Sequence, residues 1–292
     1  TLDSNNSYFK INDPESLWNK RSLTDLYHQA YTPWEWHEEL FNFAREIGIT
    51  CFSTPSDNEA VDLLESLDCP LYKVASFENC HLPLLRKIAS TNKPVIVSTG
   101  ISSLPEIDSV ISTLTENGCK KYALLVCVSS YPAKAEDYNL KRINTLREIY
   151  GCPVGISDHT LNNVVSISSI IMGGTIIEKH FISDRKIKTL DSAFSIEPDE
   201  LSLLVSEVNA AQKALGDGHF NIGKNEKKSL QFKRSIFCSK DIKKGDVITN
   251  NNISIVRPGY GLPPNQYDYI LGLKANIDIP KGTPIKWEST YG

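Results

Sequence analysis

Short β-prone runs alternate with stretches of helical period from residue 49 to residue 215. This alternation is typical of repeated strand–helix units, which build a parallel sheet. Each run begins with apolar residues and ends with polar ones, so its polar tail marks where a strand covered on both faces leaves the core. We predict six such strands, at 49–55, 71–78, 94–100, 123–132, 153–160 and 175–184.

Helix signals lie between the predicted strands. They are Pro33 at a first turn after Thr32, and helical stretches at 57–67, 105–117 and 197–215. Right-handed crossovers then order consecutive strands side by side. Six units are two fewer than a closed TIM barrel needs, and residues 1–30 contain no run of the same kind. We therefore expect an α/β fold, a TIM-type (β/α) barrel over residues 1–215 that lacks its first two strands.

The C-terminal quarter of the chain has a different sequence pattern. Residues 216–229 are polar and Gly-rich, which is typical of a linker. Beyond them, RSIFCSKDIKKGDVIT and KANIDIPKGTPIKW repeat a strand–DIxKG–strand pattern. This repeat predicts a small β-rich domain over residues 230–292.

The composition excludes several kinds of partner. The chain has 292 residues and a net charge of -4, so it offers no basic field for nucleic acid or an anionic membrane surface. No apolar run approaches the roughly 18 residues of a membrane span, and the polar start is unlike a signal peptide. The seven cysteines form no CxxC pair and fall mostly in apolar runs, so we expect buried free thiols in a reducing cytoplasm.

Two histidines, His159 and His180, lie in the polar tails of consecutive predicted strands. In a TIM-type barrel these tails face one active-site mouth, where two neutral imidazoles can share a divalent ion. A lone histidine in a strand is more often structural, but the matched positions favour a metal site. Two imidazoles with oxygen donors nearby predict Mn or Mg rather than a closed zinc site.

Other polar residues occupy the same tails. Hydroxyls and backbone N–H groups there could cradle a phosphate, although ordinary capping of the following helix is an equal alternative. Lys73 lies inside an otherwise apolar strand, where a cation is costly unless it meets an anion, so we expect it to bind a phosphate or a carboxylate. The candidate binding residues in these tails are Ser76, Ser98, Thr99, Gly100, Ser129, Tyr131 and Ser157.

Glu78 and Glu178 are carboxylates at strand ends. Either could orient a hydroxyl, move a proton or pair with a lysine. Glu178 lies two residues before His180 and so projects to the same face of its strand, which favours a catalytic role.

The motifs YKVASFEN, PVIVSTG, SSYP, GISDHT and IIEKHF, with IVRPGYGLPP and DIPKGTPIKW near the C-terminus, together resemble the sialic acid synthases. In that family a barrel is followed by an antifreeze-like (SAF, β-clip) domain, and the resemblance covers essentially the whole chain. Members that make sialic acid typically have SGE where this chain has Ser76-Phe77-Glu78, and GPD where it has Thr189-Leu190-Asp191. The segments ASFE, YTPWEWH and DSAFS are instead similar to the bacterial pseudaminic acid synthases.

The resemblance implies a condensation of phosphoenolpyruvate with 2,4-diacetamido-2,4,6-trideoxy-L-altrose, which gives pseudaminic acid and phosphate. A metal on His159 and His180 would hold the sugar aldehyde oxygen as a Lewis acid. By position, residues that match phosphoenolpyruvate-binding or sugar-binding ones are Lys73, Ser76, Thr99, Ser157, Glu178, Tyr131 and Asp191. Arg257 corresponds to an arginine that reaches into the neighbouring subunit, which implies a domain-swapped homodimer; a surface salt bridge is the simpler alternative.

The family's barrel opens with two strands that carry a glutamate, a lysine and a glutamine, and this chain starts just beyond both. Two missing strands would leave two sheet edges unpaired. We therefore expect this chain to be unstable or inactive and the natural gene product to be longer. Two alternatives stay open: a synthase of N-acetylneuraminate or legionaminic acid, and an inactive carbohydrate-binding fragment.

Overall fold

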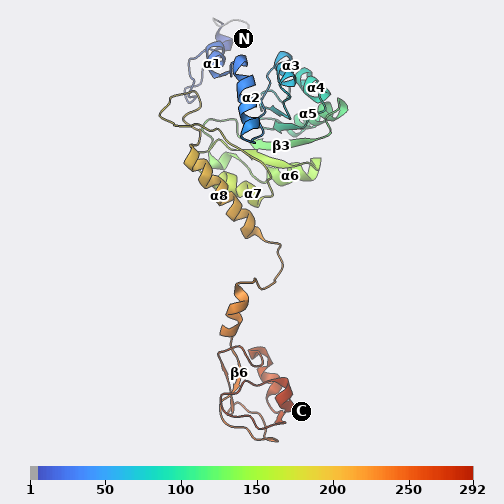
Figure 1. The fold of residues 1–292 in the computed structure, drawn as a ribbon, viewed down its shortest axis with the longest axis vertical. Helices are drawn as coiled ribbons and strands as arrows, with labels where there is room; N and C mark the ends of the chain where they lie inside the picture. Colours follow the sequence, from blue (N-terminus) through green and yellow to red (C-terminus); the bar gives the residue numbers. More distant parts are fainter. Residues whose placement is uncertain (1–5, 292) are drawn as a thin grey trace. The chain divides into compact units, whose positions relative to one another are not determined.

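The computed structural model describes residues 6–291 and divides the chain into two compact units, Thr1–Gly216 and Asp217–Gly292 (Figure 1). Each unit has its own hydrophobic core. Within the described residues, no helix is both long enough and apolar enough to cross a bilayer.

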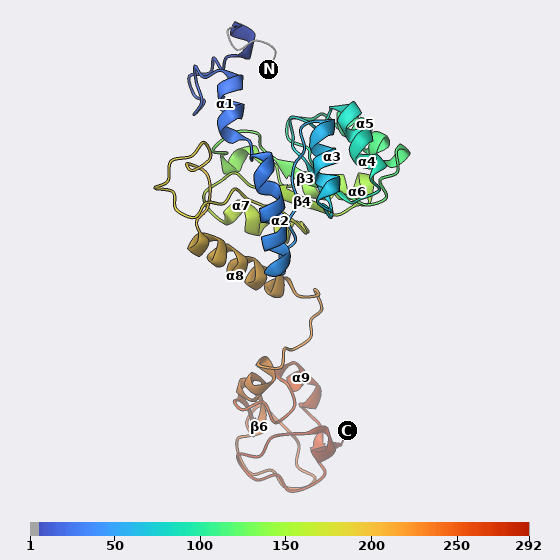
Figure 2. The same ribbon diagram turned by 45° about the horizontal axis from the view of Figure 1, so that its top comes forward.

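The first unit is built on a parallel sheet whose strands follow one another in chain order, β1-β2-β3-β4-β5. The register pairs Tyr72 with Val95, and Ser157 with Glu178. The strands are β1 (Tyr72–Val74), β2 (Val95–Ser98), β3 (Tyr122–Cys127), β4 (Val154–Ser157) and β5 (Ile177–Glu178). The sheet curls as a part of a barrel does, so the predicted α/β fold of TIM type is confirmed (Figures 1 and 2).

Helices between the strands cover the outside of the sheet. Figures 1 and 2 show α3, α4 and α5 side by side, and α7 packs against α8. Their apolar faces bury Val61, Leu85, Ile88 and Leu114 against the strand residue Val97. The helices are α1 (Leu23–Ala30), α2 (His37–Glu46), α3 (Asn58–Ser66), α4 (Leu82–Ser90), α5 (Leu104–Glu116), α6 (Arg142–Tyr150), α7 (Val164–Ile171) and α8 (Pro198–Leu215), with short 3-10 turns η1 (Ser7–Phe9), η2 (Trp34–Trp36) and η3 (Ala135–Asp137).

Side-chain caps fix where several helices begin. The Asp57 carboxylate accepts a hydrogen bond from the Ala60 backbone N–H at the start of α3. A capping box joins Ser103 and Glu106 at the start of α5. Each cap satisfies an N–H group that the first turn of a helix leaves without a partner.

The predicted strand at 49–55 is wrong. In its place the structure has a single parallel bridge from Ser53 to Tyr72. A strand needs a ladder of successive pairs, and here the neighbouring Phe52 is 39% exposed and Pro55 has no N–H to donate. The other five strands are shorter than predicted, because their polar tails continue as loops rather than as ladder.

The prediction of buried cysteines is correct for most positions and wrong for two. All seven thiols are free, and five are buried. Cys80 is exposed and Cys51 is partly exposed. Both lie in connecting segments beside the sheet rather than in it, so their neighbours in the chain do not enclose them.

The second unit is small and β-rich. Its core gathers Ile236, Ile242, Ile253, Ile270 and Ile279. The elements are η4 (Glu226–Phe232), β6 (Ser235–Cys238), β7 (Ile253–Val256), η5 (Pro264–Gln266), α9 (Tyr267–Ile270), β8 (Lys274–Ala275), η6 (Trp287–Ser289) and β9 (Thr290–Tyr291). The pairs β6–β7 and β8–β9 are antiparallel.

The two DIxKG repeats of the second unit meet each other. Ile242 and Ile279, one from each repeat, form an antiparallel bridge. The Asp241 carboxylate accepts a hydrogen bond from the Lys281 N–H at 2.7 Å, and Asp278 accepts one from the Lys244 N–H at 2.8 Å. The repeat seen in the sequence is therefore a pair of equivalent turns in space.

Candidate active site

A pocket of about 340 Å³ opens at the carboxyl ends of the strands in the first unit. Parallel strands bring these ends to one edge of the sheet, which is why polar tails that lie far apart in the sequence meet there. The pocket is lined by Thr54, Lys73, Ala75, Ser76, Phe77, Ser98, Cys127, Tyr131, Ser157, His159, Glu178, Lys179 and His180. Eight of the residues that the sequence singled out are in this lining: Lys73, Ser76, Ser98, Tyr131, Ser157, His159, Glu178 and His180.

The two histidines lie side by side, with ring centroids 5.3 Å apart. His159 Nδ1 is 2.8 Å from the carbonyl oxygen of Val128, and His180 Nδ1 is 3.2 Å from Asp191 Oδ2. A carbonyl oxygen can only accept, so His159 Nδ1 carries the proton and His159 Nε2 has the free lone pair. The His159 ring is thus held in the tautomer that a metal ligand needs, by the kind of outer contact that orients metal-binding histidines.

The pair fits a two-imidazole metal site. Their rings lie close together, and neutral imidazole is a common ligand of divalent ions. Among residues 6–291 there is no group of three or more His, Cys, Asp or Glu side chains that could hold a metal, so the two imidazoles would be the protein's part of the site. Burial lowers the pKa of His159, which keeps the imidazole neutral.

A line of polar contacts joins Lys73 to His159 across the sheet. The Lys73 ammonium donates to Ser98 Oγ at 2.7 Å and lies 3.6 Å from Glu178 Oε2. Ser157 donates to Glu178 Oε1 at 2.6 Å, and its Oγ is 3.2 Å from His159 Nε2. Burial lowers the pKa of Lys73, and the Glu178 carboxylate opposes that shift. The arrangement places a buried cation next to hydroxyls at one end of the pocket and the imidazoles at the other.

The hydroxyl cluster depends on a glycine. Ser76 Oγ and Ser129 Oγ are 2.8 Å apart, and Gly100 lies against both. A Cβ on Gly100 would stand 2.4 Å from Ser76 Cβ and 2.8 Å from Ser129 Oγ, and its φ of +34° also favours glycine. Thr99 precedes Gly100 in the chain, but its hydroxyl donates a hydrogen bond to the Leu125 carbonyl at 3.1 Å. Because Gly100 has no side chain, the turns after three strands can approach one another and bring the Ser76 and Ser129 hydroxyls together.

Glu78, Asp191 and Arg257 lie outside the pocket lining. Glu78 is half-buried just beyond β1, and burial raises the pKa of its carboxyl. Asp191, which the sequence placed with the substrate, instead lies with its Oδ2 3.2 Å from His180 Nδ1. Arg257 belongs to the second unit, directly after β7, whereas every lining residue comes from the first.

An aromatic cluster beside the histidines includes residues that the sequence gave no reason to choose. Tyr131 lies 4.5 Å from His159 between ring centroids, and burial raises the pKa of its hydroxyl to about 12. Phe194 is 4.9 Å from His180, and Trp18 is 5.7 Å from Tyr131. Trp18 comes from a polar stretch near the N-terminus, where the one local signal is the tryptophan itself.

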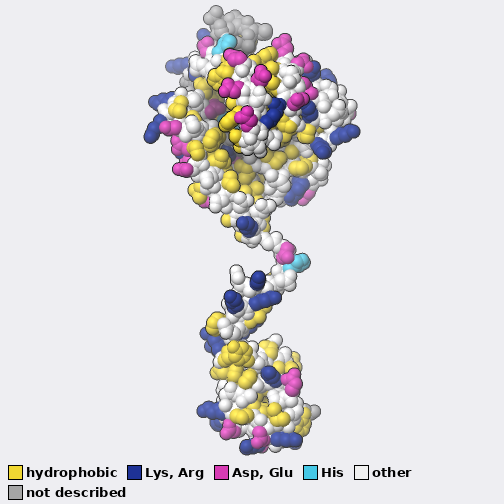
Figure 3. Space-filling view, in the orientation of Figure 1, with side chains coloured by type: hydrophobic (Ala, Val, Ile, Leu, Met, Phe, Trp, Pro, Cys, Tyr) yellow, Lys and Arg dark blue, Asp and Glu magenta, His cyan; other side chains and the backbone are white. Residues whose placement is uncertain are grey.

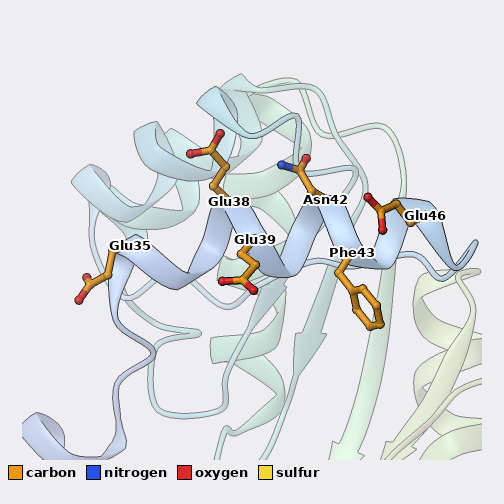
Figure 4. Close-up of a pocket in the computed structure, with 6 residues that line it drawn as sticks. All are labelled: Glu35, Glu38, Glu39, Asn42, Phe43 and Glu46. Carbon is orange, nitrogen blue, oxygen red and sulfur yellow. The ribbon is translucent and has the colours of Figure 1, made fainter.

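A second hollow runs along α2 and is larger, at about 540 Å³ (Figure 4). Figure 4 shows side chains that point outward from the helix rather than toward a common centre. It is lined by Glu35, Glu38, Glu39, Asn42, Phe43 and Glu46. Four carboxylates without a basic partner in this lining repel an anionic substrate, so size alone does not make this hollow the site.

Charges of both signs are mixed on the surface. The face of the first unit in Figure 3 carries Asp and Glu side chains among Lys and Arg, with hydrophobic side chains between them. The net charge of -4 is consistent with this pattern.

The curled parallel sheet, with its pocket at the strand carboxyl ends and a β-rich unit that follows it in the chain, defines a (β/α)-barrel protein with an appended small domain. The NeuB family model matches residues 1–220, and the SAF domain model matches residues 233–289. The chain belongs to the NeuB family and carries a SAF domain.

Several relatives are similar over most of their length. The pseudaminic acid synthase of Helicobacter pylori is 42% identical over 286 residues, which are 98% of this chain and 84% of that protein. The N,N'-diacetyllegionaminic acid synthase of Campylobacter jejuni is 38% identical over 81% of this chain and 72% of that protein. A crystal structure of N-acetylneuraminic acid synthetase from Leptospira borgpetersenii, in complex with citrate, has a TM-score of 0.66 and 32% identity, and the match covers 71% of this chain and 73% of that one.

Proposed function

We propose that the protein is a pseudaminic acid synthase. In this reaction C3 of phosphoenolpyruvate attacks the aldehyde carbon of 2,4-diacetamido-2,4,6-trideoxy-L-altrose, water adds at C2, and the C–O bond to phosphate breaks. One observation carries the proposal: a single pocket joins the two imidazoles, the buried Lys73 and the Glu178 carboxylate. The 42% identity to a pseudaminic acid synthase over 98% of the chain supports this choice of sugar.

The anionic substrate meets the end of the pocket that holds Lys73. Its ammonium already lies against Ser98 Oγ, and Ser76 and Ser129 place two more hydroxyls nearby. Phosphoenolpyruvate brings the negative charge that offsets the desolvation of this lysine. A carboxylate or phosphate there would gain charge-assisted hydrogen bonds, which are stronger than neutral ones.

The aldehyde meets the end of the pocket that holds the histidines. We assign His159 and His180 as the ligands of a divalent ion, Mn or Mg, which when bound supplies Lewis acidity at the aldehyde oxygen. Glu178 accepts the hydrogen bond of Ser157 between the two ends of the pocket. It is therefore the carboxylate placed to take the proton of the water that adds at C2.

We further propose that the protein works as a homodimer in which Arg257 completes the partner's pocket. Support comes from the family resemblance of the RPGYG segment and from the place of Arg257, exposed on the second unit. Mixing tests it: Arg257→Ala and His159→Ala subunits are each expected to be inactive alone. Re-associated, they should recover about a quarter of the unaltered activity, because half of the dimers then contain one intact site. No recovery would show that each subunit completes its own site.

A legionaminic or N-acetylneuraminate synthase is the second candidate, favoured by the 38% identity to a legionaminic acid synthase. The substrates differ in the stereochemistry and substituents of the sugar, so a competition assay separates them. We also propose a cytoplasmic location, which the seven free thiols support.

Binding and turnover together test the main proposal. Calorimetry is expected to show Mn²⁺ binding that His159→Ala abolishes and phosphoenolpyruvate binding that Lys73→Met abolishes. His219→Ala, at an exposed position, is the matched control for the first variant. With the altrose substrate, phosphate and a nine-carbon acid should appear in equal amounts, and turnover by this chain would overturn the expectation that it is inactive. Absence of phosphoenolpyruvate binding, or faster turnover of another sugar, would contradict the proposal.

A further inference from the structure

Each candidate metal ligand is preceded in the chain by a charged residue that lies in the protein interior. Asp158 precedes His159, and Lys179 precedes His180. The Lys179 ammonium is 3.0 Å from Asp158 Oδ2, and the two side chains are 3% and 0% exposed. This ion pair therefore links the segments from which the two imidazoles project.

The pair is held by a complete set of hydrogen bonds. Asp158 Oδ1 accepts from the N–H and the hydroxyl of Thr160, at 2.9 and 2.8 Å. Asp158 Oδ2 accepts from Ser166 Oγ of α7 at 2.5 Å. Lys179 also donates to the carbonyl of Thr160 at 2.6 Å and to that of Asn162 at 3.4 Å. The three donors of the ammonium are occupied, so Lys179 is not available to a substrate although it borders the pocket.

The backbone ladder ends just before the histidines. The last register pair of β4 and β5 is Ser157 with Glu178, and the Asp158 N–H still donates to the Glu178 carbonyl at 2.8 Å. Beyond that point, in residues 6–291, the backbone partners of the two histidines come from other segments. The His159 N–H donates to the Tyr138 hydroxyl and its carbonyl accepts from the Ala133 N–H, while the His180 carbonyl accepts from the Ile196 N–H. The side-chain ion pair thus continues the connection between the two strand ends where the ladder stops.

Stability does not explain why charges are used here. Burying an ion pair costs desolvation that its attraction repays only partly, and an apolar pair of similar volume is often as stable or more so. An ion pair with six hydrogen-bonding contacts does supply direction, because each contact restricts the orientation of both chain segments. What the pair contributes is geometry rather than free energy of folding.

We propose that Asp158 and Lys179 are positioning residues that set the separation of His159 and His180, and so the affinity of the site for a divalent ion. The inference rests on the proposed function, in which the two imidazoles share that ion. Removal of groups that orient metal ligands typically weakens metal binding about 10- to 100-fold.

The test replaces both charges at once, so that no unpaired charge is left in the interior. In Asp158→Asn with Lys179→Met, the amide can still accept from Thr160 and the Ser166 hydroxyl can turn to accept from the amide. The matched control is Asp62→Asn with Lys87→Met, the same chemical change at an ion pair with an N–O distance of 2.5 Å between exposed side chains. Mn²⁺ binding is measured by electron paramagnetic resonance of the free ion, and phosphoenolpyruvate binding by calorimetry without metal.

We expect the buried double variant to bind Mn²⁺ about 10-fold or more weakly, with an unchanged melting temperature and unchanged phosphoenolpyruvate affinity. The control should match the unaltered chain in all three. Equal Mn²⁺ affinity in the buried variant and the control would overturn the positioning role and leave the proposed function intact. Absence of Mn²⁺ binding by the unaltered chain would instead overturn the metal role, and the inference with it.

Ser166→Ala keeps the test decisive if the double variant does not fold. It removes one donor to Asp158 from the far side of the pair and touches neither histidine. A folded Ser166→Ala protein should bind Mn²⁺ several-fold more weakly than the unaltered chain, with the same affinity for phosphoenolpyruvate. Unchanged Mn²⁺ affinity in this variant would contradict the proposal.

Discussion

Two Asp–Lys pairs in this molecule have the same length and opposite surroundings. In the first unit Lys179 Nζ is 3.0 Å from Asp158 Oδ2, and in the second Lys243 Nζ is 3.0 Å from Asp278 Oδ2. The first pair is 3% and 0% exposed, and the second is 73% and 59% exposed. An identical distance therefore joins charges that water does not reach in one case and that water surrounds in the other.

The difference teaches that burial, rather than distance, decides what an ion pair does. Exposed ion pairs add little to the free energy of unfolding, because water and salt screen the two charges and both side chains lose conformational freedom. Buried pairs are costly to form and much more costly to break, since a lone charge is then left without solvent. In the first unit the buried pair lies beside the pocket, where Lys73 and His159 are buried polar groups as well, so the desolvation of charged and polar groups is concentrated there.

The largest expected effect comes from breaking the buried pair on one side only. Lys179→Met leaves the Asp158 carboxylate buried without its cation, which should lower the free energy of unfolding by about 3–5 kcal/mol. Thermal unfolding should then begin roughly 10 °C lower. Lys243→Met is the control and should have the same melting temperature as the unaltered chain. Equal melting temperatures for the two variants would break the comparison, since burial would then make no difference.

Lys73→Met extends the comparison to a second buried lysine. The Lys73 ammonium lies 3.6 Å from Glu178 Oε2, farther than Lys179 lies from Asp158. Burial lowers the pKa of Lys73, so the unfolded chain binds more protons than the folded one between the lowered pKa and its ordinary value of 10.5. The free energy of unfolding should therefore rise with pH in that window, and Lys73→Met should abolish the rise. At neutral pH the variant should melt about 2 °C higher, a gain of about 1 kcal/mol, while phosphoenolpyruvate binding is lost.

A control separates charge from volume at this site. Lys73→Arg keeps the cation and should not show the higher melting temperature. Arginine does not titrate below pH 10.5, so this variant should also lack the rise of stability with pH. A melting temperature that falls in Lys73→Met would mean that the contacts with Ser98 and Glu178 outweigh the desolvation of the lysine.

Glu78→Gln should change the free energy of unfolding less than Lys73→Met does, and the pH dependence that it removes has the opposite sign. Burial raises the pKa of Glu78 above 4.5, so the folded chain holds this proton more tightly than the unfolded one. The unaltered chain should gain stability as the pH falls through the raised pKa toward 4.5, and lose it as the pH rises. The glutamine variant should lack this slope and be about 0.5 kcal/mol more stable at neutral pH. Urea unfolding at pH 5 and at pH 8 measures both, and parallel curves for the two proteins would contradict the assignment.

The fold was largely predictable because the strands are apolar on both faces. The runs that became β2, β3 and β4 are continuous hydrophobic stretches, which leave no ambiguity about burial. Residues 49–55 have a similar composition but pair only at Ser53, because ladder formation depends on a neighbouring strand rather than on local preference. The sequence could therefore predict a strand there but not its partner.

The site was predictable as far as the strand ends reach. His159, His180, Lys73 and Glu178 come together because parallel strands end at one edge, and their catalytic and metal roles stay predictions. The contacts that orient them were not predictable. Val128, Asp191 and Trp18 reach the histidines or Tyr131 from loops, and a loop contact over a long stretch of chain has no local signal.

The smallest expected effect belongs to the exposed pair, and it completes the comparison. Lys243→Met with Asp278→Asn removes two charges that lie 3.0 Å apart, as Lys179→Met with Asp158→Asn does in the first unit. Asp278 Oδ1 also accepts from the Lys244 N–H, and the backbone donor and the side-chain donor both lower the pKa of its carboxyl. An asparagine keeps the acceptor for that N–H, so the turn between the DIxKG repeats should survive. We expect unchanged melting temperature and unchanged Mn²⁺ affinity, because solvent already screens this pair. A loss of Mn²⁺ affinity here would mean that the second unit influences the histidines, and burial alone would no longer separate the two pairs.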